Sequence, residues 1–144
     1  AGRNHRLYLE RYREHAEPRL DDPRIEVEDF VADPRPAYAR AAVVVVPLVA
    51  SAGTNIKVLE AMAMGKAVVS TPAGVHGLDL TPGADLLVAA TPEEFAAAVR
   101  SVLLDRDRRR ALGQRARTTA ERGYSWDAIA GEQRRLYRDL AGLS

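Results

Sequence analysis

Four consecutive valines at residues 43–46, followed by Pro47, predict a buried β-strand. A loop of small residues follows at 48–55, then a helix over 55–64 and a second strand over 67–71. Strand, helix and strand in this order indicate a parallel βαβ unit, because parallel neighbours need a crossover connection. The segment therefore predicts an α/β fold whose first strand is covered on both faces.

The rest of the chain supports an α/β fold with a Rossmann-like parallel sheet and flanking helices. Further strands are expected at 25–30, as an edge strand, and at 85–89, which makes four in all. Helices are expected at 5–16, 37–42, 92–104, 105–123 and 125–143, and residues 72–77 are expected to be a loop.

Local signals refine three of these elements. Thr91 is expected to cap the helix 92–104, and Ser125 the terminal helix, in which Trp126 is expected to anchor the apolar side to the core. Gly65 is expected to end the helix 55–64 in a left-handed conformation, with Lys66 favouring the negative end of that helix.

The chain is expected to form one domain, residues 1–144. Its net charge of +1 disfavours nucleic acid as a partner, and the lack of cysteine excludes disulfides and thiolate metal sites. No apolar run has the length of a membrane span and no signal peptide is evident, so a cytoplasmic protein is expected.

Functional residues are expected after the strand 43–47, because ligands of open parallel sheets bind at the carboxyl ends of strands. Gly53 and Thr54 are small enough for an anion to approach the backbone amides at the following helix start. Lys57 adds a positive charge there. Glu60 lies six residues beyond Thr54, roughly 9 Å along the helix, where its carboxylate could bind ribose hydroxyls. The alternative is an ordinary surface pair of Lys57 with Glu60.

The segment GTNIKVLEAMAMGKAVVSTPAGVHGL at 53–78, with ARAAVVVVPL before it and EEFAAAV and YSWD after it, resembles a known family. The likeness is to the carboxyl-terminal donor-binding domain of the family 4 retaining glycosyltransferases of the GT-B type. It is strongest for bacterial members that assemble exopolysaccharides and other cell-surface glycans. The resemblance implies a fragment, the C-terminal half of a GT-B fold without its first strands.

What the resemblance implies for function is a domain that binds a nucleotide-sugar without a metal ion or another cofactor. The diphosphate would lie at the helix start and the ribose at Glu60. Asn55, which would also line the donor site, stands where a subgroup of the family has a basic residue. Gly74 and His76 follow the second strand at the same edge of the sheet. His76 could approach the donor or simply be exposed, and Gly74 fits a turn and could also leave room for the nucleotide. Ala52 stands where many members have a glutamate that contacts the sugar.

The glycan or lipid-linked acceptor would be bound by the absent amino-terminal domain, so no catalytic residue is assigned here and the isolated chain is expected to be inactive. Two alternatives remain open: a nucleotide-sugar epimerase of the same fold, and a noncatalytic interaction domain. Exposed sheet edges would favour a homodimer, and lipid-linked acceptors would bring the protein to the inner face of the membrane.

Overall fold

The computed structural model describes residues 22–26, 28, 31–51 and 53–142, which divide between two compact units, 1–36 and 37–144. In the first unit, two exposed ion pairs each join residues two positions apart in the chain. Arg24 binds Asp22 at 2.6 Å and Arg35 binds Asp33 at 2.8 Å. The helix expected at 5–16 lies outside the described residues, as do three residues of the strand expected at 25–30.

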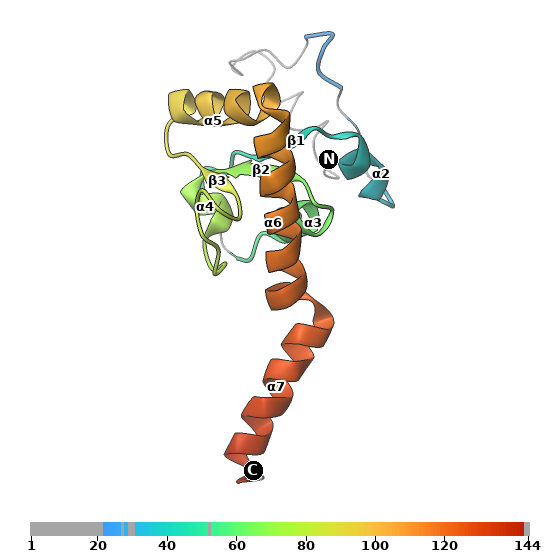
Figure 1. Ribbon diagram of the computed structural model, residues 1–144, viewed down its shortest axis with the longest axis vertical. Coiled ribbons are helices and arrows are strands. Elements are labelled where there is room, and N and C mark those ends of the chain that lie inside the picture. The colour runs from blue at the N-terminus through green and yellow to red at the C-terminus, as the bar shows by residue number, and fades with distance from the viewer. Residues whose placement is uncertain (1–21, 27, 29–30, 52, 143–144) are drawn as a thin grey trace. The chain divides into compact units, whose positions relative to one another are not determined.

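The described part of the second unit contains a three-stranded parallel sheet in the order β1-β2-β3 (Figure 1). Its strands are β1 (Val43–Val46), β2 (Ala67–Ser70) and β3 (Leu87–Val88). The predicted strands at 43–47 and 67–71 are confirmed to within one residue. The strand predicted at 85–89 is shorter, because Asp85 turns its carboxylate back to the amide of Thr81 and Leu86 forms only an isolated bridge with Pro82.

The described helices alternate with these strands and then end the chain (Figure 1). Two of them begin at predicted caps. The Thr91 hydroxyl accepts a hydrogen bond from the backbone amide of Glu94, and the Ser125 hydroxyl accepts one from the backbone amide of Ala128. The helices are α2 (Arg35–Arg40), α3 (Ile56–Ala63), α4 (Pro72–Val75), α5 (Pro92–Leu104), α6 (Arg106–Tyr124) and α7 (Trp126–Leu140).

The short helix α4 replaces the loop expected at 72–77. Pro72 and Gly74 indicate a break in the sequence pattern, but proline is well tolerated in the first turn of a helix. The side chain of Thr71 accepts a hydrogen bond from the amide of Gly74 at 3.3 Å and caps this turn. A short helix therefore forms where the sequence predicted a loop.

Side chains on the two faces of the sheet enter two apolar clusters. On one face, α3 and α6 pack against β1 and β2, with Val46, Val58, Ala61, Met62, Val68, Leu86, Ala116 and Ala120 buried. On the other face, α5 and α6 enclose Ala67, Val69, Leu87, Val102 and Leu112. The prediction that the first strand is covered on both faces fails at Val45, which is 47% exposed, although Val43 on the same face packs against the second cluster.

The turn at the end of α3 brings three elements together. Gly65 has a φ of 66° and ends the helix as predicted. Gly113 of α6 lies against the Gly65 carbonyl. The ammonium of Lys66, however, does not bind the end of its own helix. It donates to the carbonyls of Ala39 and Ala41, at 2.9 and 3.1 Å, and so holds the end of α2.

Helix α7 presents its apolar side to solvent. No residue of α7 is buried, and Trp126 is 84% exposed, so the prediction that it anchors the helix to the core is wrong. Its sequence has the apolar spacing of a packed helix, but the described residues supply no element to cover that side. In the part of the chain that the structure describes, no helix has the length and apolar character needed to span a bilayer.

Asp85 joins the turn before β3 to α6. Asp85 is buried, with 4% of its surface exposed. Its carboxylate accepts hydrogen bonds from the Thr81 amide at 2.8 Å and from the Thr119 hydroxyl at 2.7 Å. It also forms an ion pair with Arg115 at 3.5 Å. Burial alone would raise the pKa of Asp85, but these hydrogen bonds and the charge of Arg115 together lower it below its usual value.

Asp85→Asn is therefore expected to destabilise the protein by about 1–3 kcal/mol at neutral pH. A carboxyl whose pKa is lower in the folded state stabilises the fold above its unfolded pKa, and this contribution is lost as the pH falls through the folded pKa. The difference from the wild type in urea unfolding should thus shrink between pH 6 and pH 3. A difference that is constant over this range would show that the charge of Asp85 does not stabilise the fold.

Candidate functional site

The loops after β1 and β2 are joined at the carboxyl edge of the sheet. The Thr71 hydroxyl donates to the carbonyl of Leu48 at 2.6 Å, and the Thr71 amide donates to the carbonyl of Val46 at 3.3 Å. The chain segments that begin α3 and α4 are thereby held side by side. This is the edge at which ligands of open parallel sheets bind.

Asn55 adds a second connection between the same two segments. Its side-chain amide donates to the carbonyls of Ala73 and Gly74, at 3.3 and 2.8 Å. Asn55 is also the N-cap of α3, but its side chain makes no capping hydrogen bond to that helix. The oxygen of the same side chain accepts a hydrogen bond from the Ser51 hydroxyl at 3.3 Å, so all three bonds of the Asn55 amide group go to the protein itself and fix the start of α3 relative to α4. Its predicted contact with a donor stays a prediction.

The surface of the loop at the start of α3 is open. Gly53, Thr54 and Lys57 are exposed, and no neighbouring atom lies within 4 Å of the position that a Cβ on Gly53 would take. A ligand could therefore approach the backbone here without displacing a side chain. The amides of Ile56 and Val58 already donate to the carbonyls of Thr54 and Asn55, so the helix dipole and the exposed ammonium of Lys57 are the features that suit an anion here.

Glu60 lies one turn further along α3 and is exposed. The surface pair with Lys57 that the sequence allows is not formed in the described part of the chain. Instead, the Glu60 carboxylate accepts a hydrogen bond from the hydroxyl of Tyr38 at 3.0 Å. Burial of the Tyr38 ring, together with this bond and the negative charge of Glu60, raises the pKa of Tyr38 to about 12.

Tyr38 is a neighbour of the site that the sequence did not predict. It lies 22 residues before Glu60, and only the packing of α2 beside α3 brings the two side chains together. The available sequence signal is weak: a tyrosine in the short helix that precedes the first strand of the βαβ unit.

Gly74 and His76 lie on α4 and at its end. Gly74 is fully enclosed, because a Cβ there would lie 2.1 Å from the hydroxyl oxygen of Ser70 and 3.2 Å from the carbonyl oxygen of Val46. Glycine at this position allows α4 to pack on the ends of β1 and β2. His76 is exposed at the C-cap of α4. The structure thus joins Asn55 directly to Gly74.

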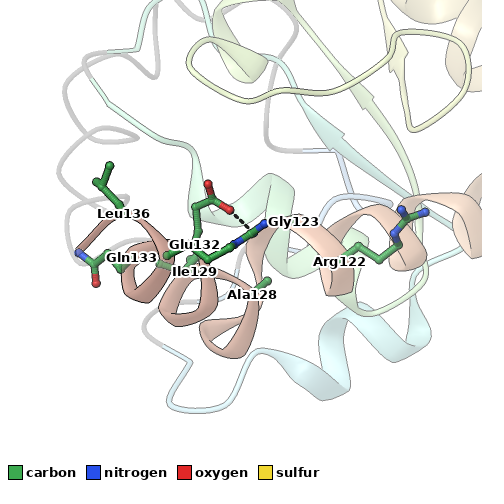
Figure 2. A pocket seen from close by; sticks show the side chains of 8 residues that line it. Arg122, Gly123, Ala128, Ile129, Glu132, Gln133 and Leu136 are labelled. Carbon is green, nitrogen blue, oxygen red and sulfur yellow. Dashed lines mark hydrogen bonds and ion pairs between the residues drawn. The ribbon is translucent and has the colours of Figure 1, made fainter. Parts of the chain in front are cut away.

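A separate hollow of about 460 Å³ lies where α6 meets α7 (Figure 2). Arg122 and Gly123 of α6 line it together with Ile129, Glu132 and Leu136 of α7. Figure 2 shows Glu132 paired with a guanidinium group, that of Arg135. None of the predicted site residues lines this hollow. Among the described residues, no three histidine, aspartate or glutamate side chains are grouped as metal ligands.

Comparisons with known proteins agree on the kind of fold. A family model described as "Glycosyl transferases group 1" matches residues 1–105. The solved structure of sucrose-phosphate synthase from Thermosynechococcus elongatus is similar, with a TM-score of 0.72 and 24% sequence identity. This likeness covers 99% of the chain and 35% of the synthase, so the chain spans about a third of that enzyme. No curated protein matches the sequence. The predicted Rossmann-like half of a GT-B fold is confirmed.

Proposed function

Because the chain belongs to the glycosyl transferases group 1 family, we propose that its loop 53–55 and α3 bind a nucleoside-diphosphate sugar. The observation that carries the proposal is the open start of α3 at the carboxyl edge of the sheet, with Lys57 and Glu60 exposed on that helix. In this proposal the diphosphate binds at the helix start and the ribose binds at Glu60.

The chemistry of glycosyl transfer fits these groups. A nucleoside diphosphate that leaves the sugar gains negative charge, and donors already in place stabilise that charge without reorganisation. The helix dipole amounts to about half a positive charge at the start of α3, and Lys57 adds a full one. Together these groups would stabilise the leaving diphosphate without a divalent ion.

We further propose that the acceptor is a cell-surface or exopolysaccharide glycan, or its lipid-linked precursor, and that the sugar is transferred with retention of configuration at the cytoplasmic side of the membrane. The acceptor would be bound by residues outside this chain, in keeping with the 35% of the synthase that the likeness covers. The 144-residue chain alone would then bind the donor and transfer no sugar.

Lys57→Ala tests the diphosphate half of the proposal. Charge-assisted hydrogen bonds contribute about 1.5–3 kcal/mol, so the dissociation constant of the matching nucleoside diphosphate should rise about 10- to 100-fold. The dissociation constants of UDP, GDP and ADP would be measured by calorimetry, and each would be compared with that of the corresponding monophosphate. The loss of affinity should be larger for the diphosphate than for the monophosphate, because the proposal has Lys57 bind the diphosphate group.

Arg110→Ala is the matched control, because it removes an exposed positive charge from α6, an element that holds none of the proposed contacts. It should leave the dissociation constant within about twofold of the wild type. The proposal fails if none of the three diphosphates binds the wild-type chain, or if the two alanine variants bind the diphosphate equally well.

A further inference from the structure

The hydroxyl of Tyr38 lies within hydrogen-bond distance of two acceptors on α3. It is 3.0 Å from Oε2 of Glu60 and 3.5 Å from the carbonyl oxygen of Lys57. The first distance is that of an ordinary hydrogen bond and the second is at the outer limit, so Glu60 is its main partner. The Tyr38 ring packs against the apolar cluster that includes Val58 and Met62 of α3.

Helix α2, which carries Tyr38, is attached to the far end of α3 by a second contact. The ammonium of Lys66 donates to the carbonyls of Ala39 and Ala41 at 2.9 and 3.1 Å. Tyr38 is therefore held by its packed ring and by the backbone that follows it. A hydroxyl fixed in this way can restrain a partner that is itself exposed and flexible.

We propose that Tyr38 is a positioning residue that holds one oxygen of Glu60, so that the other is presented to the vicinal hydroxyls of a ribose. This inference rests on the proposed function, since it specifies how Glu60 takes part in nucleotide binding. A carboxylate has about four acceptor positions on its two oxygens. The bond from Tyr38 uses one of them and leaves Oε1 for the ligand.

The protonation of Tyr38 suits this role. Burial of its ring and the adjacent carboxylate raise the pKa of Tyr38 to about 12, so the phenol stays a hydrogen-bond donor at neutral pH. Lys57, whose ammonium could compete for the carboxylate from one turn away, forms no ion pair with Glu60 in the described part of the chain. Its charge is therefore left for the diphosphate.

Tyr38→Phe tests the inference, because it removes the hydroxyl and keeps the ring. The wild-type chain and the variant would be titrated with a ribonucleoside diphosphate and with its 2′,3′-dideoxy counterpart. The ratio of the two dissociation constants reports only the contacts to the ribose hydroxyls. We expect Tyr38→Phe to lower the wild-type preference for ribose about three- to tenfold, and to leave the affinity for the dideoxy compound unchanged.

Three further variants make this result specific. Glu60→Gln should lower the ribose preference at least as much as Tyr38→Phe, and the double variant should lose nothing more, because the hydroxyl acts through Glu60. Tyr124→Phe is the matched control. Its hydroxyl also bridges two segments, accepting from the Asp79 amide at 2.7 Å and lying 3.2 Å from the Asp79 carbonyl, and its loss should leave the ratio unchanged.

The outcomes separate this inference from the function on which it rests. If Tyr38→Phe weakened the binding of both compounds by the same factor, the hydroxyl would have a merely structural role. This result would overturn the inference but leave the proposed function standing. An unchanged ratio would overturn it as well. A wild-type chain that binds no nucleoside diphosphate would overturn the proposed function, and the inference with it.

Discussion

Replacing Gly113 with alanine is expected to destabilise the protein by about 3 kcal/mol, although alanine is the better helix former. A Cβ at Gly113 would lie 2.2 Å from the carbonyl oxygen of Gly65 and 3.4 Å from the amide nitrogen of Ala67. Removing glycine from a helix interior stabilises it by only about 1 kcal/mol. The clash outweighs this gain, so the net change in stability is a loss. The Gly65 carbonyl belongs to the turn between α3 and β2, and this turn cannot move without shifting both of these elements.

Urea unfolding followed by circular dichroism would measure this effect. Gly123→Ala is the matched control, since it makes the same substitution in the same helix at a position with no neighbouring atom within 4 Å of the added Cβ. Gly123→Ala should stabilise the protein by about 0.5–1 kcal/mol. Equal effects of the two substitutions would mean that α6 does not approach Gly65 as closely as the structure shows.

Gly74→Ala should destabilise the protein by about 2–3 kcal/mol. The added Cβ would lie 2.1 Å from the hydroxyl oxygen of Ser70 and 3.2 Å from the carbonyl oxygen of Val46. The Ser70 side chain is buried and donates to that same carbonyl at 3.3 Å, so it has little freedom to move aside. Relief would require α4 to shift, which would stretch the bond from Asn55 to the Gly74 carbonyl.

The cause of this effect can be isolated with a second substitution. Ser70→Ala alone should destabilise the protein by about 1 kcal/mol through its lost hydrogen bond. In the Gly74→Ala chain, however, the same change removes the nearest clashing atom and should raise stability, as measured by urea unfolding. A double variant that equals the sum of the two single effects would exclude the Ser70 hydroxyl as the obstacle.

The regular elements followed from local patterns. The valine run at 43–46 and the apolar run at 67–71 gave the strands, and Thr91 and Ser125 marked helix starts whose capping bonds the structure shows. The failures have tertiary causes. Val45 and Trp126 were expected to be buried and are exposed, because apolar residues in a strand or on a helix face do not specify which element will cover them.

The candidate site divides in the same way. The spacing of Lys57 and Glu60 in the sequence was sufficient to place both on one helix beside the loop 53–55. Three contacts could not be predicted, because they join residues far apart in the chain: Tyr38 with Glu60, Asn55 with Gly74, and Lys66 with the end of α2. Each depends on how helices pack, which local periodicity does not determine.

The hydrogen bonds of Thr71 and Asn55 have a practical consequence for protein engineering. Thr71 binds the carbonyl of Leu48, and Asn55 binds those of Ala73 and Gly74, so the described residues of the loop before α3 and the segment 71–74 support each other. A graft that exchanges only one of them would leave the other without its hydrogen-bond partners. A designer who wishes to alter ligand preference should transplant both segments together, as a single cassette.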